Sequence, residues 1–298
     1  MKKVVLSTIA SFLLSSLSYA ITDLQACFNQ FNAGNYKLAV FYGQKAVKEY
    51  PASPTAYYCL GKAYSRTGQI TKAIESLKKA SSYTSNDRYL MYIYNWLGSE
   101  YESQGDDSNA LFYDSKSLKL AEQLGNNNVE YSDLNNIADV FHDKGYDAKA
   151  LLYYKKALEL VHGKVTTGAI YNNIAMIYED THHYKKAIKY FQTAINIDDR
   201  YGRYLSGAED MLNLGDAYRR IKDFKDAKFY FDSGLERMKK VGNKDGEGLG
   251  YGYLGLYYRD IGNKILARKY FTKALNIFRS IGDYVDVSAT LKYLSSFK

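Results

Sequence analysis

The chain has 298 residues, of which 46% are hydrophobic, and its 40 basic and 32 acidic residues give a formal charge of +8. This hydrophobic fraction is enough for a packed core. Only 2 prolines, and no Ser/Thr/Pro-rich tract beyond the N-terminus, exclude a recognisable linker, so we expect one continuous domain. Basic residues alternate with Asp and Glu instead of forming one run, which argues against a nucleic-acid partner.

Residues 1–20 have the features of a secretion signal. Lys2 and Lys3 precede an apolar run, Val4–Leu17, and Ser18-Tyr19-Ala20 places small residues at both ends of a cleavage motif. The run is shorter than the ~20 residues of a membrane-spanning helix. We therefore expect a signal peptide cleaved near Ala20 and a mature chain that is exported to the periplasm or secreted.

An alternative is a lipoprotein, because Leu24-Gln25-Ala26-Cys27 resembles a lipidation box. Asp23 and Gln25 argue against it, since they are polar where such a signal is still apolar and small. Membrane association is therefore expected only if Cys27 is lipidated, and the prediction is that it is not.

The stretch Tyr131–Leu160 shows the pattern on which the rest of the chain is built. Its first half carries apolar residues at i, i+3, i+4 and i+7, which form one face of a helix: Leu134, Ile137, Ala138 and Phe141. Gly145 ends this helix, and a second one follows with Ala150, Tyr154 and Ala157 on its inner face. Small alanines allow the two helices to approach closely, so the stretch predicts an antiparallel helix pair.

Copies of this stretch recur along the chain. Each has an alanine at the same place in its second helix, spaced by 34 to 40 residues: Ala39, Ala73, Ala110, Ala150, Ala187, Ala227 and Ala267. Where the spacing lengthens, a glycine recurs, at Gly125, Gly202, Gly242 and Gly282, and is predicted to end an extended second helix.

The pattern aromatic-x2-Leu-Gly/Ala-x2-Tyr followed by Ala-x3-Phe/Tyr resembles the tetratricopeptide repeat. The longer form is similar to the repeats of kinesin light chain and of spindle-orientation adaptors, which bind extended peptides. The resemblance implies an all-α, right-handed superhelical solenoid with seven helix-turn-helix repeats and a C-terminal capping helix. The expected bounds are 21–52, 54–86, 91–126, 131–163, 168–200, 208–242 and 248–282 for the repeats, within a solenoid at 21–298, and 284–297 for the cap.

Other motifs favour structural roles over chemistry. His182-His183 falls in a turn between helices without Cys or carboxylate support, so no metal site is expected. The chain lacks Gly-x-Ser-x-Gly, His-Glu-x-x-His and Walker-type sequences, and we expect neither an enzyme nor a cofactor. The glycine-rich stretch 246–252 lacks a preceding strand and a following Lys-Ser/Thr, so a loosely wound, mobile helix start is expected instead of a phosphate loop.

Two further predictions concern the ends of the solenoid. Cys27 and Cys59 are placed on opposite faces of their helices, so free, partly buried thiols are expected. The capping helix carries Leu291 and Leu294 at core-type positions and is expected to cover the seventh repeat.

The resemblance also implies which residues bind a ligand. With Leu134 counted as position 4 of its repeat, positions 2, 5, 6, 9, 12 and 13 of the first helices line the concave surface. In this sequence they include a row of asparagines at position 6, two more asparagines at position 5, one aromatic pair, two aspartates and two arginines. These residues are Asn136, Asn173, Asn213, Asn135, Asn172, Trp96, Tyr92, Asp139, Asp216, Arg220 and Arg259.

We expect the position-6 asparagines to pair with the backbone of an extended segment, because an amide both donates and accepts hydrogen bonds. Tyr92 and Trp96 are expected to form an apolar anchor. The Lys and Asn set that grips a C-terminal carboxylate in chaperone-binding relatives is not reproduced. The predicted function is therefore an exported adaptor for a protein or peptide partner, and the alternative is an architectural spacer of a cell-envelope or secretion complex that does not use the groove.

Overall fold

The computed structural model describes residues 23–161 and 166–296. The signal peptide expected at residues 1–20 lies outside these ranges. The chain divides into two compact units, Met1–Leu160 and Val161–Lys298, and each has its own packed interior. None of the helices in the described ranges combines the length and the apolarity needed to cross a membrane.

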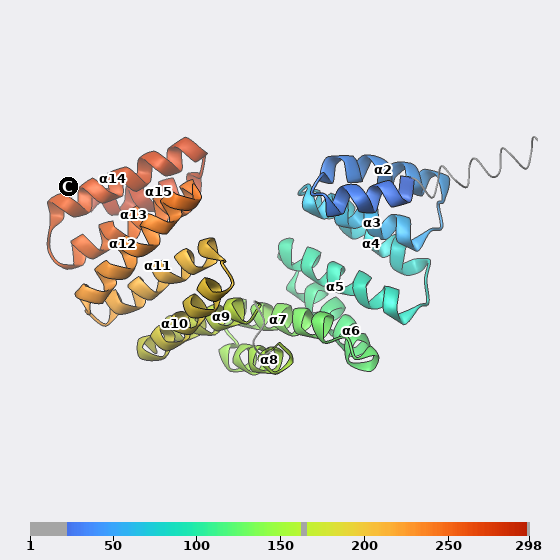
Figure 1. The fold of residues 1–298 in the computed structure, drawn as a ribbon, viewed down its shortest axis with the longest axis horizontal. Helices are drawn as coiled ribbons and strands as arrows, with labels where there is room; N and C mark the ends of the chain where they lie inside the picture. The colour runs from blue at the N-terminus through green and yellow to red at the C-terminus, as the bar shows by residue number, and fades with distance from the viewer. Residues whose placement is uncertain (1–22, 162–165, 297–298) are drawn as a thin grey trace, which may run out of the picture. The chain divides into compact units, whose positions relative to one another are not determined.

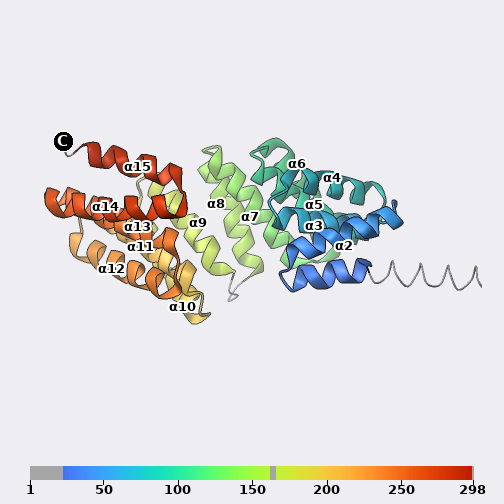
Figure 2. The same ribbon diagram turned by 90° about the horizontal axis from the view of Figure 1, so that it is seen from above.

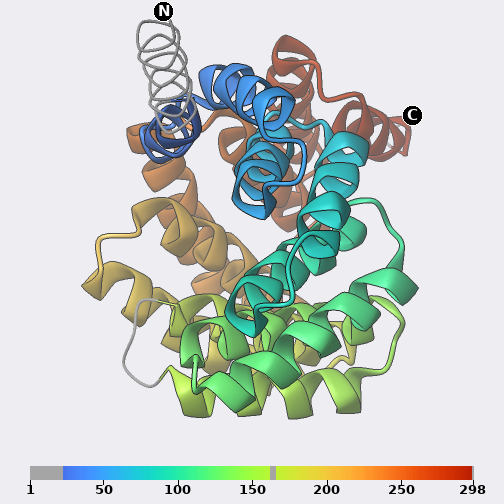
Figure 3. The same cartoon turned by 90° about the vertical axis from the view of Figure 1, so that its right-hand side faces the viewer.

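The first unit consists of helices in antiparallel pairs (Figure 1). A helix at residues 23–32 precedes α2, and α3 with α4, α5 with α6, and α7 with α8 form the next pairs. The first helices of successive pairs also touch one another, α3 with α5 and α5 with α7. Figure 3 shows these pairs, coloured blue to green, from another side. The bounds are α2 (Tyr36–Glu49), α3 (Pro54–Arg66), α4 (Ile70–Ser82), α5 (Asp87–Ser103), α6 (Asp107–Leu124), α7 (Asn127–Asp143) and α8 (Asp147–Leu160).

The second unit continues with three pairs and one further helix. Helix α9 pairs with α10, α11 with α12 and α13 with α14, and α15 packs on α14 at the end of the unit (Figure 2). The bounds are α9 (Thr167–Asp180), α10 (Tyr184–Arg200), α11 (Tyr204–Arg220), α12 (Phe224–Val241), α13 (Lys244–Asp260), α14 (Lys264–Ile281) and α15 (Tyr284–Ser295). The predicted all-α architecture of seven helix pairs and a capping helix is confirmed.

Helix ends follow local sequence signals. Gly125, Gly242 and Gly282 adopt positive φ angles of 64°, 72° and 77° and cap α6, α12 and α14, as predicted from the recurring glycine. Gly202 also has a positive φ, but it follows Tyr201, which caps α10. His182, with φ of 61°, takes the left-handed place in the turn before α10 that glycine takes in most other pairs.

The core of each pair is built on the repeated alanine. All seven of these alanines are fully buried, and the aromatic residue four places later is fully buried at Tyr154, Phe191, Phe231 and Phe271. A glycine of the first helix faces two of these rings: a Cβ added at Gly215 would lie 2.6 Å from the Phe231 ring, and one added at Gly255 would lie 2.7 Å from the Phe271 ring. This close approach is the physical reason for the Gly/Ala position in the repeat.

The expectation of free thiols was wrong, because Cys27 and Cys59 form a disulfide with 6.4 Å between their Cα atoms. Both residues are buried in a small cluster with Ala39 and Ala63. The helix at residues 23–32 and α3 are equivalent first helices placed side by side. When equivalent helices stack side by side, the face that one helix turns toward its neighbour is opposite to the face that the neighbour turns back. A disulfide between them therefore joins residues on opposite faces of the repeat, as Cys27 and Cys59 are.

The glycine-rich stretch lies within α13 instead of forming a loose helix start. The helix begins at Lys244, and Asn243 caps it by accepting the Gly246 N–H at 2.7 Å. Gly246, Gly248 and Gly250 are buried, and a Cβ at Gly248 would lie 2.6 Å from the Phe278 ring. These three glycines serve close packing.

The capping helix α15 packs differently from the prediction. Leu291 is 42% exposed, and the buried residue of α15 is Thr290, which is 5% exposed. Positions 4 and 7 of a first helix face the second helix of the same repeat, and no such helix follows α15 in the described residues. The seventh repeat is thus covered through a different face of α15, which includes Thr290 and Tyr293.

Candidate functional site

A polar pocket of about 330 Å³ lies in the first unit, between the first helices α3, α5 and α7. It brings together two of the residues predicted from sequence, Trp96 of α5 and Asn136 of α7. Hydrogen-bonding groups dominate its wall, which suits a polar ligand. The residues lining it are Ser65, Arg66, Asn95, Trp96, Ser99, Glu100, Ser103, Ser132 and Asn136.

The side-chain amides of Asn136 and Asn95 in the pocket donate hydrogen bonds to buried aspartates. The Asn136 side-chain nitrogen donates to Asp114 at 3.4 Å. The Asn95 side-chain nitrogen donates to Asp133 at 2.7 Å and to the Ser132 hydroxyl at 3.1 Å. Part of the donor capacity of both amides is thus used inside the protein, which leaves their carbonyl oxygens to accept hydrogen bonds in the pocket.

Asp114 and Asp133 are both fully buried. Burial, reinforced by the nearby Asp133, raises the pKa of Asp114 to about 8. Burial raises the pKa of Asp133 to about 7, against the opposing effect of its hydrogen bond from Asn95. Asp114 occupies the place of the aromatic residue in Ala-x3-Phe/Tyr. It fits there because Gly98 has no side chain: a Cβ at that position would lie only 1.9 Å from the Asp114 Oδ1.

Glu100 gives the pocket an unpaired acceptor. Its side chain lines the pocket and the residue is 3% exposed, yet its Oε2 has no hydrogen-bond partner among the described residues. Burial raises the pKa of Glu100, while a hydrogen bond with Ser65 and the charge of Arg66 oppose this shift. A buried carboxylate oxygen without a donor is costly, so the site favours a ligand that brings an N–H or ammonium group.

Trp96 lies at the edge of this pocket within a group of aromatic and basic side chains. Its ring makes an edge contact with Phe31, and Lys62 and Arg66 lie 5.2 Å and 5.7 Å from its centroid. The indole also hydrogen-bonds to Tyr58. Burial and the nearby Arg66 lower the pKa of Lys62. Trp96 is therefore held in place from several sides, as a rigid wall of the site.

The other predicted residues of the first unit lie outside the pocket lining. Tyr92 is 38% exposed and accepts a hydrogen bond from the Asn126 amide at 3.2 Å. Asn135 donates to Asp139 at 2.8 Å, and Asp139 also accepts from the Tyr154 hydroxyl. Burial raises the pKa of Asp139 to about 6. Asn135 and Asp139 are thus bonded within the protein.

The predicted asparagines of the second unit are all half-buried in α9 and α11. The Asn172 nitrogen lies 3.8 Å from the Met176 sulfur, and its carbonyl oxygen is buried without a partner among the described residues. Asn173 and Asn213 occupy equivalent positions in successive first helices. Asn136 belongs to the other unit, and the three-residue ladder stays a prediction.

The predicted charges of the second unit form ion pairs. Asp216 accepts from Arg219 at 2.7 Å and from Arg220 at 3.1 Å, and Arg219 also binds Asp260. Arg259 pairs with Asp260 at 2.9 Å. Burial, together with the nearby Asp216, raises the pKa of Glu179. Arg220 keeps half of its side chain exposed, so its guanidinium remains accessible to a ligand.

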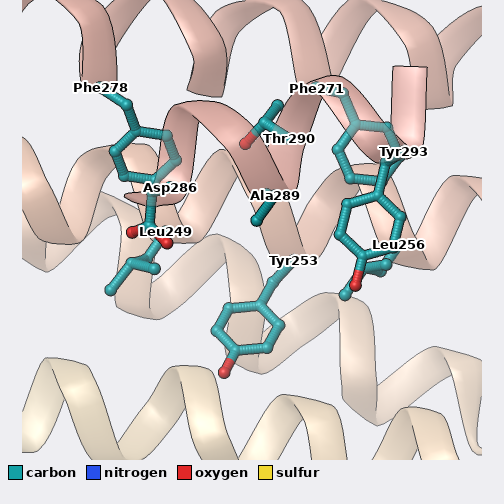
Figure 4. A pocket seen from close by; sticks show the side chains of 10 residues that line it. Leu249, Tyr253, Leu256, Phe271, Phe278, Asp286, Ala289, Thr290 and Tyr293 are labelled. Carbon is teal, nitrogen blue, oxygen red and sulfur yellow. The ribbon is translucent and has the colours of Figure 1, made fainter. Parts of the chain in front are cut away.

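A second pocket, of about 210 Å³, lies between α13, α14 and α15 (Figure 4). Its wall is mainly apolar, and its polar groups are one carboxylate, one threonine hydroxyl and the hydroxyls of two tyrosines. The residues lining it are Leu249, Gly252, Tyr253, Leu256, Phe271, Phe278, Asp286, Ala289, Thr290 and Tyr293. The four residues of α13 occupy positions 2, 5, 6 and 9 of the seventh repeat, yet none of them was predicted as a site residue.

Sequence reasoning missed Glu100, Asn95 and Asp114, although the repeat contains signals for them. Glu100 is charged at a position where the first helices of the second and of the fourth to seventh repeats carry the apolar residues Ala63, Val140, Ile177, Ala217 and Tyr257. Asp114 breaks Ala-x3-Phe/Tyr in one copy, and Asn95 precedes Trp96 as Asn135 precedes Asn136. A polar residue at a core position of one copy is thus the signal that marks the pocket.

Comparisons with known proteins agree with this architecture. Models of the tetratricopeptide repeat match residues 42–75, 134–160, 166–240 and 251–280. Superkiller protein 3 of Schizosaccharomyces pombe is 27% identical over 135 residues, which are 44% of this chain and 9% of that protein. The chain therefore matches only a small part of that relative's length.

Two solved structures show the same fold. A Signal Transduction ATPase with Numerous Domains (STAND) protein with a tetratricopeptide repeat sensor, from Pyrococcus horikoshii, gives a TM-score of 0.72 at 22% identity, over 86% of this chain and 40% of that one. A Rap protein complexed with Competence and Sporulation Factor gives 0.60 at 14% identity, over 95% and 98%. With its repeated alanines and seven helix pairs, the chain belongs to the tetratricopeptide repeat family.

Proposed function

We propose that this protein is an exported adaptor whose first unit binds an extended segment of a partner protein in the polar pocket between α3, α5 and α7. The observation that carries the proposal is the buried Glu100 carboxylate: Glu100 lines the pocket, and its Oε2 has no hydrogen-bond partner among the described residues. An extended peptide presents one backbone N–H per residue, which is the kind of donor this oxygen lacks.

The amides support the same ligand. Because their nitrogens donate to Asp114 and Asp133, Asn136 and Asn95 keep their carbonyl oxygens to accept hydrogen bonds, and both residues line the same pocket as Glu100. Three acceptors in one pocket match the backbone N–H groups of an extended segment. Hydrogen bonds contribute a net ~0.5–1.5 kcal/mol each, whereas a micromolar complex needs about 8 kcal/mol. The remainder requires apolar contact, and Trp96 is the large rigid side chain of the site that supplies it.

The similar proteins agree with a binding role. The STAND protein contains a tetratricopeptide repeat sensor, and the Rap protein was crystallised in a complex with a factor. Export rests on the sequence of residues 1–20. N-terminal sequencing of the protein recovered from cell fractions tests it: a chain that begins at Ile21 outside the cytoplasm supports export, and an intact Met1 inside it contradicts export.

The binding proposal is tested by capture from an envelope extract with the mature chain and its Glu100→Gln variant as baits. Gln keeps the size of the side chain but replaces an acceptor by a donor, so a captured partner is expected to be lost or weakened about tenfold or more, as when a buried polar pair is broken. Glu122→Gln is the matched control, because Glu122 is an exposed glutamate of the same unit.

Equal capture by Glu100→Gln and Glu122→Gln would contradict the proposal. If both variants and Trp96→Ala hold the same partner as the unmodified chain, the contact lies on another surface. That result would favour the architectural spacer, which uses its convex face or its ends.

A further inference from the structure

We propose that the pocket between α13 and α15 is a second binding site. It takes an aromatic or branched aliphatic side chain of a partner protein together with a neighbouring lysine or arginine. The site lies wholly within the second unit and does not depend on the pocket around Glu100.

The pocket is a groove between one face of α13 and one face of α15. Its residues on α13 and on α15 are each spaced at i, i+3, i+4 and i+7, so each set forms one face of its helix. Phe271 and Phe278 of α14 close the floor between them, and Tyr293 stacks on Phe271 with 5.1 Å between ring centroids (Figure 4). The walls are thus rigid and largely apolar.

The groove is open because two facing residues are small. A Cβ added at Gly252 would meet no atom within 4 Å, and Ala289 lies on the opposite face, that of α15. Earlier repeats carry larger side chains at the position of Gly252: Tyr58, Asn95, Asn135, Asn172 and Leu212. The missing side chain leaves the cavity of about 210 Å³.

The size of the cavity indicates one side chain. An apolar cavity of roughly 150 Å³ holds a benzene molecule, so this one accommodates an aromatic ring or a branched aliphatic group. It is smaller than the ~300–1,000 Å³ of pockets that enclose a whole drug-sized ligand. A side chain projecting from a longer segment is the occupant that fits.

The negative charge at the pocket indicates which type of residue would neighbour the bound side chain in the partner. Asp286 lines the pocket, and carboxylate oxygens of Asp245, Asp283 and Asp286 all lie within 4.8 Å of one another. In the described ranges no lysine or arginine forms an ion pair with any of the three, and the nearby Lys244 pairs with Glu247. Burial, with Asp283 and Asp245, raises the pKa of Asp286. A basic group of a partner would relieve this concentration of negative charge.

Two capped dipeptides serve as probes: acetyl-Phe-Arg-amide, which matches the proposal, and acetyl-Phe-Glu-amide, which reverses the charge. In NMR titrations of the purified protein we expect the Arg probe to shift resonances of α13 and α15 and to bind about fivefold more tightly than the Glu probe, the ratio that one partly exposed ion pair supplies. Equal affinity of the two probes, or shifts elsewhere only, would overturn the proposal.

Two variants locate the site. Gly252→Leu fills the cavity and is expected to abolish binding of both probes while keeping or raising the thermal midpoint, because leucine is the better helix former. Asp286→Asn is expected to remove the preference for the Arg probe. Binding that survives in Gly252→Leu would show that the ring does not enter this pocket.

Two controls test whether the site is independent of the polar pocket and whether it binds a metal ion. Glu100→Gln is expected to bind the Arg probe as the unmodified protein does, so the two proposals fail independently. Calcium chloride tests whether the three carboxylates hold a metal ion instead. Calcium that shifts the same resonances at micromolar concentration and displaces the Arg probe would overturn the assignment to a basic side chain.

Discussion

The sulfur atoms of Cys27 and Cys59 are bonded to each other, and this disulfide joins the helix at residues 23–32 to α3. The two residues are 32 positions apart. Closing a loop of this length is expected to stabilise the N-terminal repeats by about 3–4 kcal/mol, mainly by restricting the unfolded chain. Reduction should therefore lower the first thermal transition and increase hydrogen exchange in residues 23–66.

The Cys27→Ser/Cys59→Ser double variant is the control for this prediction. It should start at the reduced stability and should not respond to reductant. Equal stability of the oxidised, the reduced and the doubly substituted proteins would show that the buried contacts around residues 27 and 59 suffice without the bond.

A second prediction concerns pH and follows from Asp114 and Asp133. Their pKa values in the folded state, about 8 and about 7, lie above the ordinary value of 3.8. The folded protein thus holds more protons than the unfolded chain between about pH 4 and pH 8, and stability falls as pH rises through this window. One pKa unit corresponds to about 1.4 kcal/mol, so even one unit at each residue would cost about 3 kcal/mol by pH 8.

Thermal denaturation between pH 5 and pH 8 measures this effect. Asp114→Asn removes one buried charge at nearly constant volume and should raise the midpoint at pH 8 more than at pH 5. Asp87→Asn, which changes an exposed carboxylate of the same unit, should leave the pH slope unchanged. A midpoint that rises with pH in the unmodified protein would contradict the raised pKa values.

A third prediction ranks the residues of the polar pocket. Trp96→Ala should weaken binding of a captured partner peptide more than Asn136→Ala, by about 2 kcal/mol or more, because a buried aromatic anchor outweighs one hydrogen bond. Phe112→Ala is the matched control, since Phe112 is a half-exposed aromatic of the same repeat on α6. Isothermal titration decides the order, and circular dichroism checks that helicity is kept.

A related variant tests whether the row of asparagines reads the peptide backbone. The triple variant Asn136→Ala, Asn173→Ala and Asn213→Ala should weaken binding further than any single change. An affinity equal to that of the unmodified chain would exclude the ladder. Loss of binding with Asn136→Ala alone would place the contact in the first unit only.

A fourth prediction concerns the boundary between the two units at Leu160 and Val161. In repeat arrays each pair contacts its neighbours, so stability is nearly a sum of local terms. A fragment of residues 161–298 should therefore be soluble and helical by circular dichroism and should unfold cooperatively. A disordered fragment beside a helical full chain would show that the second unit requires the first.

The periodic features of this fold were accessible from sequence because they are local. Spacing at i, i+3, i+4 and i+7 places residues on one helix face whatever surrounds the helix, and a glycine after the last turn adopts positive φ without cost. Both rules apply within one repeat, so the helix pairs, the alanine core and the caps at Gly125, Gly242 and Gly282 were predicted correctly.

Relations between repeats required the tertiary structure. Cys27 and Cys59 lie on opposite faces when each helix is considered alone, and they meet because parallel neighbouring helices touch through opposite faces. Gly252 is an ordinary helical residue in sequence, and it opens a pocket only because Ala289 of α15 stands across from it.

The polar pocket shows the division most clearly. The sequence by itself determined that Trp96 and Asn136 occupy position 6 of neighbouring repeats, since a periodic chain repeats its geometry. It did not determine that Glu100 is 3% exposed or that Asp114 accepts a hydrogen bond from the Asn136 amide. Burial and hydrogen bonding depend on side chains from α3, α5, α6 and α7 together. Only packing between the repeats decided which polar atoms remain to bind a ligand.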